Sequence, residues 1–298
     1  MTSYQTFLQK LRGGLARYLG EGYRVEIREV RKNNGVVCSG LMILCGDSNV
    51  FPTIYMEELF QSYVDGVPLS HIMHNVLCLY ERCRIRENFD TEIFRDFKRI
   101  RERIAYRLVG YEKNREQLPE IPHMRYLDMA LVCYISFPME GPGSAAALVR
   151  QDMCRLWGIG EEELFACAGE NTPRLFPACI RDMRQVLKKR TESSYEKEES
   201  AYMYLLTNKK GQYGAVCMVY PQLLQKVAQR LEHNFFILPG SVHETILVPE
   251  RRGVKGSDFG AIVREINRTQ VDPEEVLTDS VYYYDRKKEK ILILDNSC

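Results

Sequence analysis

The sequence predicts an α+β fold in which a mostly antiparallel or mixed sheet is built from β-hairpins and helices pack against that sheet. Three observations lead to this prediction. Runs rich in apolar and β-branched residues occur in pairs, and short turn-forming segments join the members of each pair. Segments with apolar residues at helical spacing follow several of these pairs. Strands joined by short turns favour antiparallel pairing, with helices covering a face of the sheet.

The clearest local signal is a β-hairpin near the N-terminus. Residues 23–28 alternate between apolar and charged side chains, and residues 36–44 form a second apolar run. Between them lie Asn33, Asn34 and Gly35, which tolerate the positive φ angles that tight hairpin turns need. We expect amphipathic helices before and after this hairpin, over residues 3–19 and 52–64.

Further along the chain, two apolar runs predict buried strands, at residues 104–109 and 127–137. A helix is expected over residues 178–190. The last third of the chain predicts three more strand pairs, at 202–207 with 213–219, 235–238 with 242–248, and 282–284 with 291–294. Helices are expected after Pro221 and from Ser257 to residue 266.

The domain organisation follows from length and from the distribution of these elements. A chain of 298 residues is long enough for one large domain or two modest ones. Pro119 and Pro122 interrupt the chain near its middle. We therefore expect a helix-rich N-terminal region with a β-hairpin over residues 1–120, and a sheet-rich α+β region over residues 121–298, with a shared core as the alternative to two independent domains.

The charge balance argues against a nucleic-acid partner. Forty-one basic residues stand against 40 acidic ones, whereas nucleic-acid-binding proteins usually show a basic excess or a concentrated basic stripe. Two stretches, residues 95–107 and 181–190, are locally basic. The first contains Asp96 and Glu102, and the second has no aromatic residue on which a base could stack. Both are typical of solvated helix faces.

Composition and cysteine usage predict a cytoplasmic protein without a membrane partner. No apolar run reaches the roughly 18 residues that a membrane-spanning helix needs. The first 20 residues lack the pattern of a secretory signal. The 10 cysteines are scattered, and several, such as Cys133 and Cys217, lie in apolar segments. This distribution is typical of small buried residues in a reducing compartment rather than of a disulfide framework.

The chain contains none of the familiar nucleotide-binding, nucleophile-elbow or zinc-hydrolase motifs, so no cofactor is predicted. One weak metal candidate is the set His71, His74 and Cys78, at i, i+3 and i+7 of an expected helix. This spacing places three potential soft-metal ligands on one helix face. The same spacing is also typical of a buried helix seam, which is the interpretation we favour over a metal site.

A weak catalytic candidate lies where a turn leads into an apolar strand. His243 and Glu244 are adjacent there, and consecutive strand residues face opposite sides of a sheet. An acid–base pair would therefore need a partner elsewhere, for which Asp128 is the candidate. The alternative is that Glu244 binds local backbone at the turn. Thiol catalysis by Cys217 beside His243 would require a specific environment that activates the thiol, and no local pattern indicates one.

Five segments carry a resemblance to a known family: residues 236–249 (FILPGSVHETILVP), 32–36 with 40–41, 52–55, 203–208 and 279–283. Together they resemble a family from clostridial gut bacteria, catalogued as a domain of unknown function with number 5688 in its series. The resemblance covers nearly the whole chain. It departs at Gly240, where a serine is expected before Ser241. The resemblance implies a cytoplasmic bacterial protein and brings no known activity, cofactor or catalytic residue.

The functional prediction is a non-enzymatic interaction or regulatory protein of the bacterial cytoplasm with a protein partner. It is motivated by the balanced charge and by the many apolar strands. The alternative is a metal-independent hydrolase or a small-ligand-binding protein with its site near His243 and Glu244. Such a site requires His243, Glu244 and Asp128 to converge on a solvent-accessible pocket.

Overall fold

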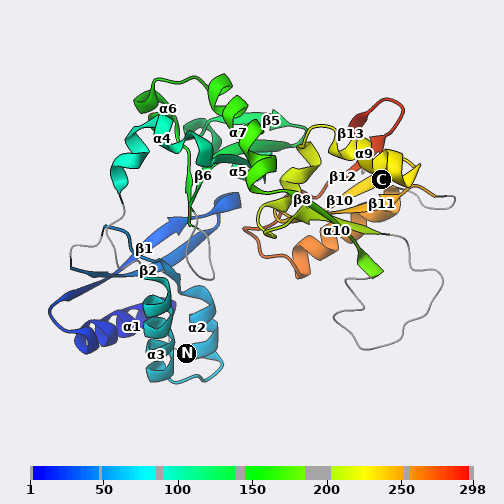
Figure 1. The fold of residues 1–298 in the computed structure, drawn as a ribbon. Helices are drawn as coiled ribbons and strands as arrows, with labels where there is room; N and C mark the ends of the chain where they lie inside the picture. The colour runs from blue at the N-terminus through cyan, green and yellow to red at the C-terminus, as the bar shows by residue number, and fades with distance from the viewer. Residues whose placement is uncertain are drawn as a thin grey trace. The chain divides into compact units, whose positions relative to one another are not determined.

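The computed structural model describes residues 3–46, 49–84, 90–137, 145–184, 203–251 and 256–294, and it confirms the predicted α+β fold (Figure 1). Three sheets are present in these residues, and all their strand pairs are antiparallel. The chain forms two compact units. The first comprises Met1–Lys32 and Val36–Glu92, and the second comprises Asn33–Gly35 and Ile93–Cys298.

The first unit is a three-stranded sheet with helices. Its elements are α1 (Tyr4–Leu19), β1 (Tyr23–Arg31), β2 (Val37–Cys45), β3 (Ile54–Tyr55), α2 (Glu57–Val64) and α3 (Leu69–Cys83). The predicted hairpin is confirmed, because β1 pairs with β2 along its full length, from Tyr23 opposite Cys45 to Arg31 opposite Val37. Asn34 has a φ of 60° in the turn, as the Asn-Asn-Gly sequence predicts.

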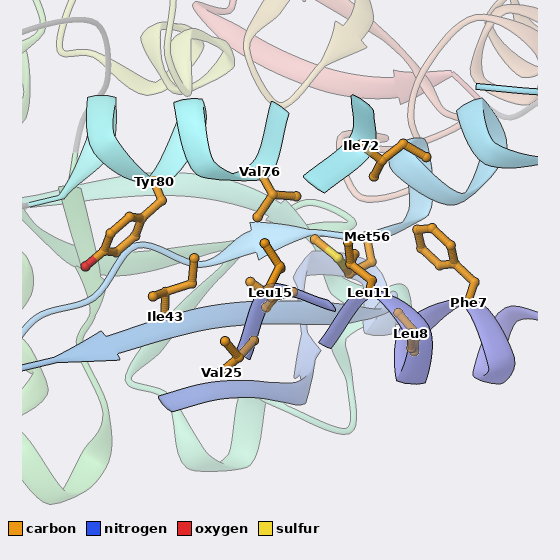
Figure 2. Packing of buried hydrophobic residues seen from close by; sticks show 11 residues of the cluster. Phe7, Leu8, Leu11, Leu15, Val25, Ile43, Met56, Ile72, Val76 and Tyr80 are labelled. Carbon is orange, nitrogen blue, oxygen red and sulfur yellow. The ribbon is translucent and has the colours of Figure 1, made fainter. Parts of the chain in front are cut away.

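The core of the first unit lies between its helices and its sheet. Figure 2 shows side chains from α1, α3 and the strands β1 and β2 pointing toward one another. Leu11 and Leu15 of α1, Ile43 of β2, and Ile72 and Val76 of α3 are almost completely buried. Residues four apart on each helix share one face, which is why the apolar stripes of both helices reach the same core.

The second unit contains the other two sheets. The four-stranded sheet is formed by β4 (Ile104–Gly110), β5 (His123–Tyr126), β6 (Met129–Phe137) and β7 (Ala145–Leu148). The central strand β6 pairs with β4 along one edge and with β5 and β7 along the other. The six-stranded sheet has the order β13-β12-β10-β11-β9-β8. Its strands are β8 (Ala178–Asp182), β9 (Tyr204–Asn208), β10 (Phe235–Ser241), β11 (Glu244–Pro249), β12 (Val281–Asp285) and β13 (Lys290–Leu294).

Helices and single helical turns connect and cover these sheets. They are η1 (Asn33–Gly35), η2 (Thr91–Arg95), α4 (Phe97–Ile100), η3 (Arg101–Arg103), α5 (Tyr111–Asn114), η4 (Leu118–Glu120), α6 (Gln151–Trp157), α7 (Glu161–Leu175), η5 (Gly214–Val219), α9 (Leu223–Leu231) and α10 (Ser257–Thr269). Buried polar groups hold α7 against β4: the Tyr106 N–H donates to the Thr172 hydroxyl at 3.0 Å, and the Asn171 amide donates to the Ile104 carbonyl at 3.0 Å. Val263 of α10 packs on the six-stranded sheet.

Two of the sequence-based assignments are wrong. Residues 213–219 were expected to form a strand, but η5 is a helical turn that follows Tyr213, whose φ is 52°. Ala215–Met218 are buried on every side, so their apolar run carries no strand-specific alternation. Residues 178–182 were expected to be helical but form β8, because pairing with β9 outweighs local helical propensity. Residues 185–190 of that expected helix lie outside the described residues.

The compact units divide at residue 92, whereas the sequence suggested a division near residue 120. That point lies within the second unit. Leu118 and Ile121, on its two sides, pack into one cluster with Val109 of β4 and Val132 of β6. A domain boundary near residue 120 would cut through this cluster. Pro119 and Pro122 therefore mark a turn within the second unit.

A pair of variants on α3 tests the core of the first unit. We expect Ile72→Ala to lower the free energy of unfolding by about 2–5 kcal/mol, because it removes a fully buried side chain and leaves a cavity. Leu79→Ala, on a side chain that is 37% exposed, should cost about 0.5 kcal/mol or less. Urea unfolding followed by circular dichroism measures both, and equal losses for the two variants would contradict the packing shown in Figure 2.

Candidate functional site

His243 lies in the turn between β10 and β11, and local hydrogen bonds fix its position. The Ser241 hydroxyl accepts the His243 N–H at 3.0 Å. The Thr207 hydroxyl donates to the His243 carbonyl at 2.8 Å. Gly214 packs against both, since a methyl group there would overlap the Thr207 hydroxyl and the His243 carbonyl oxygen. The turn, the end of β9 and the start of η5 are therefore held together around one imidazole.

Both ring nitrogens of His243 are engaged. The Tyr213 N–H donates to Nδ1 at 3.0 Å, so Nδ1 is an acceptor and the proton of the neutral ring is on Nε2. Nε2 then donates to Glu275 Oε1 at 3.2 Å. The imidazole also stacks on the Tyr213 ring, with centroids 5.6 Å apart and planes 18° apart. To act as a general base, His243 would have to give up one of these hydrogen bonds.

Arg107 extends this arrangement into a cationic and aromatic cluster. It is on β4, and its guanidinium lies over the Tyr213 ring with 4.5 Å between the guanidinium carbon and the ring centroid. The Tyr134 ring meets Tyr213 edge to face at 5.4 Å. We call Arg107, Tyr134, Tyr213, His243 and Glu275 the Arg107 cluster.

The Arg107 cluster contains one buried hydrogen-bond donor that has no described acceptor. Arg107 Nε is buried, and it has no hydrogen-bond partner among the described residues. The side chain as a whole is partly exposed. Burial raises the pKa of the neighbouring Tyr134 hydroxyl, which therefore stays protonated and neutral at physiological pH. An unpaired cation beside neutral aromatic rings can bind an anion by charge and by hydrogen bonds.

Asp128 belongs to a different set of contacts. Its carboxylate accepts hydrogen bonds from the Thr278 hydroxyl at 2.6 Å and from the Tyr282 hydroxyl at 2.5 Å. Burial raises the pKa of Tyr282, and the charge of Asp128 adds to this shift. Asp128 thus has two structural partners, and no described contact joins it to His243 or Glu244.

Glu244 is the first residue of β11, directly after the turn that holds His243. The side chain is partly exposed and has no hydrogen-bond partner in the part of the chain that the structure describes. It lies beside Gly240, whose added methyl would come within 3.3 Å of Glu244 Cγ. The structure therefore does not bring His243, Glu244 and Asp128 together into one acid–base set.

The weak metal candidates lie on the exposed face of α3. His71, His74 and Cys78 are all exposed, and the His74 imidazole contacts the Cys78 thiol at 3.5 Å. Among the described residues, no group of three or more His, Cys, Asp or Glu side chains has the arrangement of a metal site. These three residues therefore do not form the buried seam that we favoured from the sequence; the buried face of α3 is formed by Ile72, Val76 and Tyr80.

Cys217 is not activated as a nucleophile. Burial raises the pKa of its thiol to about 12, and the thiol donates to the Thr207 carbonyl at 3.3 Å. A thiol is nucleophilic mainly as the thiolate, which this environment disfavours.

Sequence reasoning missed four members of the Arg107 cluster: Arg107, Tyr134, Tyr213 and Glu275. Arg107 is the one charged residue within the apolar strand Ile104–Gly110, and that isolated charge was the available signal. Tyr213 and Glu275 gave no comparable signal, because Tyr213 was placed on an expected strand and Glu275 at the start of a short helical turn. Their approach to His243 depends on tertiary contacts over 30 and 32 residues of sequence separation.

Fold and site together define an α+β protein with antiparallel sheets and a partly buried cationic and aromatic cluster. A model described as a family of unknown function (DUF5688) matches residues 4–286, and the chain belongs to this family. No curated protein and no solved structure matches the chain. Within the described residues, no helix has both the length and the hydrophobicity needed to cross a bilayer.

Two glycine variants test the packing around the His243 turn. We expect Gly214→Ala to destabilise the protein by about 1–3 kcal/mol, because the methyl has to displace the Thr207 hydroxyl or the His243 carbonyl. The control is Gly169→Ala in α7, where the methyl meets only the Tyr106 ring at 3.8 Å. It should be neutral or stabilise by about 0.5–1 kcal/mol. Thermal unfolding compares them, and a Gly214→Ala variant as stable as the control would contradict this packing.

The buried tyrosines predict a loss of stability at high pH. Burial raises the pKa of Tyr106 to about 12 and also raises that of Tyr282. In the unfolded chain these groups ionise near pH 10, at about their model value. Their stabilising contribution is therefore complete below about pH 10 and is lost as the pH rises toward the folded-state values.

An alkaline titration that records tyrosinate absorbance and circular dichroism together measures this effect. We expect part of the tyrosine absorbance change to appear only as the protein unfolds. Tyr282→Phe should reduce that late part, whereas Tyr18→Phe, at a residue 72% exposed, should leave it unchanged. Complete ionisation of the tyrosines near pH 10 in a protein that remains folded would contradict their burial.

Proposed function

We propose that this protein is a non-enzymatic interaction or regulatory protein of the bacterial cytoplasm, and that it binds a small oxyanion, a phosphate or carboxylate group, at Arg107. The observation that carries the proposal is the buried Nε of Arg107, which has no hydrogen-bond partner among the described residues and belongs to a partly exposed side chain. A buried donor without a partner costs about 1–3 kcal/mol. A bound oxyanion would remove this cost and add charge-assisted hydrogen bonds.

The geometry of guanidinium favours this class of ligand. Its fork of N–H groups matches the paired oxygens of carboxylate and phosphate, and its plane stacks on aromatic rings. Tyr213 holds the Arg107 plane from one side, and His243 in turn holds Tyr213. The guanidinium is thus oriented before any ligand arrives, which lowers the entropic cost of binding.

Binding is better supported than hydrolysis. Hydrolysis near His243 would need a base and a partner that act together, but both imidazole nitrogens of His243 are engaged, Asp128 is bound by two hydroxyls, and no described contact joins Glu244 to either. These arrangements suit a rigid support for a recognition site. The cytoplasmic setting is supported by the free thiols of the nine described cysteines, which a reducing compartment maintains.

Thermal denaturation of the full chain with inorganic phosphate, pyrophosphate and citrate as probes tests the proposal. At about a hundred times its Kd, a probe that binds at Arg107 should raise Tm by about 5–10 °C. Arg107→Met should abolish the shift, and Arg107→Lys should retain part of it because the charge remains while the fork is lost. The matched control is Arg125→Met, since Arg125 also covers a tyrosine ring, that of Tyr111, at 4.4 Å.

The stability of the ligand-free variants separates a binding role from a structural one. Methionine has a similar length and no unpaired donor, so Arg107→Met should leave Tm unchanged or raise it. If no probe stabilises the wild-type chain, or if Arg107→Met loses more than about 2 kcal/mol of stability without ligand, the arginine is structural and the proposal is wrong.

A further inference from the structure

The six-stranded sheet ends in a strand with an open edge. β13 pairs with β12 from Lys290 opposite Asp285 to Leu294 opposite Val281. It is the terminal strand in the sheet order, and among the described residues no strand pairs with its other side. The outward N–H and C=O groups of such a strand are a template for pairing with a further extended segment.

The side chains of β13 favour such pairing rather than opposing it. Leu292 is 43% exposed and Ile293 is 39% exposed, and the two point to opposite faces of the sheet because they are consecutive. Proline, bulges and charged residues usually protect edge strands; β13 contains no proline and no register shift, and its one charged residue, Lys290, stands at its first position. A strand added beyond β13 would cover apolar surface on both faces at once.

The turn that leads into β13 gives the edge a positive charge. Its sequence, Asp-Arg-Lys-Lys-Glu-Lys over residues 285–290, contains four basic and two acidic residues. Asp285 is engaged with Lys288 at 3.6 Å and with backbone N–H groups of the turn. Lys287 and Lys290 are exposed and have no ion-pair partner in the described part of the chain.

We propose that β13 is a docking edge for an extended, acidic segment of another protein, which adds as an antiparallel or parallel strand. Backbone pairing would supply affinity, and alternating apolar residues in the segment would contact Leu292 and Ile293. Acidic residues in the segment would face Lys290 and Lys287. The inference uses different residues from the Arg107 cluster and stands or falls independently of it.

Selection from a random linear peptide library against the full chain, followed by fluorescence polarisation with the enriched synthetic peptide, tests the inference. The enriched peptides should alternate apolar and polar positions and contain acidic residues. Hydrogen exchange should show new protection at residues 290–294 when the peptide binds. Lys290→Glu should weaken binding about tenfold or more, equivalent to about 1.4 kcal/mol.

A matched pair of edge variants completes the test. Leu292→Thr keeps β propensity but removes apolar contact, and should weaken binding. Ile180→Thr makes the same kind of change on β8, the opposite edge strand of the same sheet, where Ile180 is 40% exposed, and should leave binding unchanged. The inference is overturned if no alternating acidic peptide is enriched, or if binding is unchanged in Lys290→Glu and Leu292→Thr. A dimer that Leu292→Thr dissociates would likewise overturn it, by identifying a second copy as the occupant.

Discussion

The second unit depends on one short segment, residues 272–280, which bonds to several parts of the chain at once. Its backbone carbonyls accept hydrogen bonds from side-chain amides: Asn34 donates to Pro273 and Val276, Asn33 to Glu274, and Asn267 to Thr278. The Glu275 carbonyl accepts the Val242 N–H. Of its side chains, the Glu275 carboxylate bonds to His243 and the Thr278 hydroxyl donates to Asp128. Only glycine fits at position 110, because a Cβ atom there would lie 2.5 Å from the Leu277 carbonyl oxygen. The segment satisfies its buried polar groups by binding the turns of other elements, which fixes those turns relative to it.

Two residues of the weak catalytic candidate, His243 and Asp128, are explained by this segment. His243 and Asp128 each bind it, His243 through Glu275 and Asp128 through Thr278, but they bind different points and serve to anchor their own turns. Polar side chains that the sequence marks as possible catalytic groups thus act mainly in positioning. His243 stacks on Tyr213, and the Tyr213 ring lies against the guanidinium of Arg107. The unusual atom is Arg107 Nε, which has no hydrogen-bond partner among the described residues.

Local patterns predicted those elements whose pairing partners are near in sequence. The hairpin of β1 and β2 and that of β12 and β13 were both identified, because alternation and turn residues specify them within a few tens of residues. Residues 213–219 and 178–182 were misassigned because tertiary burial and distant strand pairing decide their conformation. The same reason explains which members of the site could be predicted. His243 was identified from its local sequence, whereas Tyr213, Glu275 and Arg107 come together only in the folded structure.

The most direct test of the account is to locate a bound oxyanion in crystals of the full chain grown with selenate, using the anomalous scattering of selenium. The account predicts a selenate within hydrogen-bond distance of the Arg107 guanidinium, with Tyr213 still stacked on His243 and the His243–Glu275 hydrogen bond intact. A map in which water alone occupies the guanidinium while selenate binds elsewhere would contradict it. Such a map would show that the segment at residues 272–280 supports a structural arginine rather than a binding site.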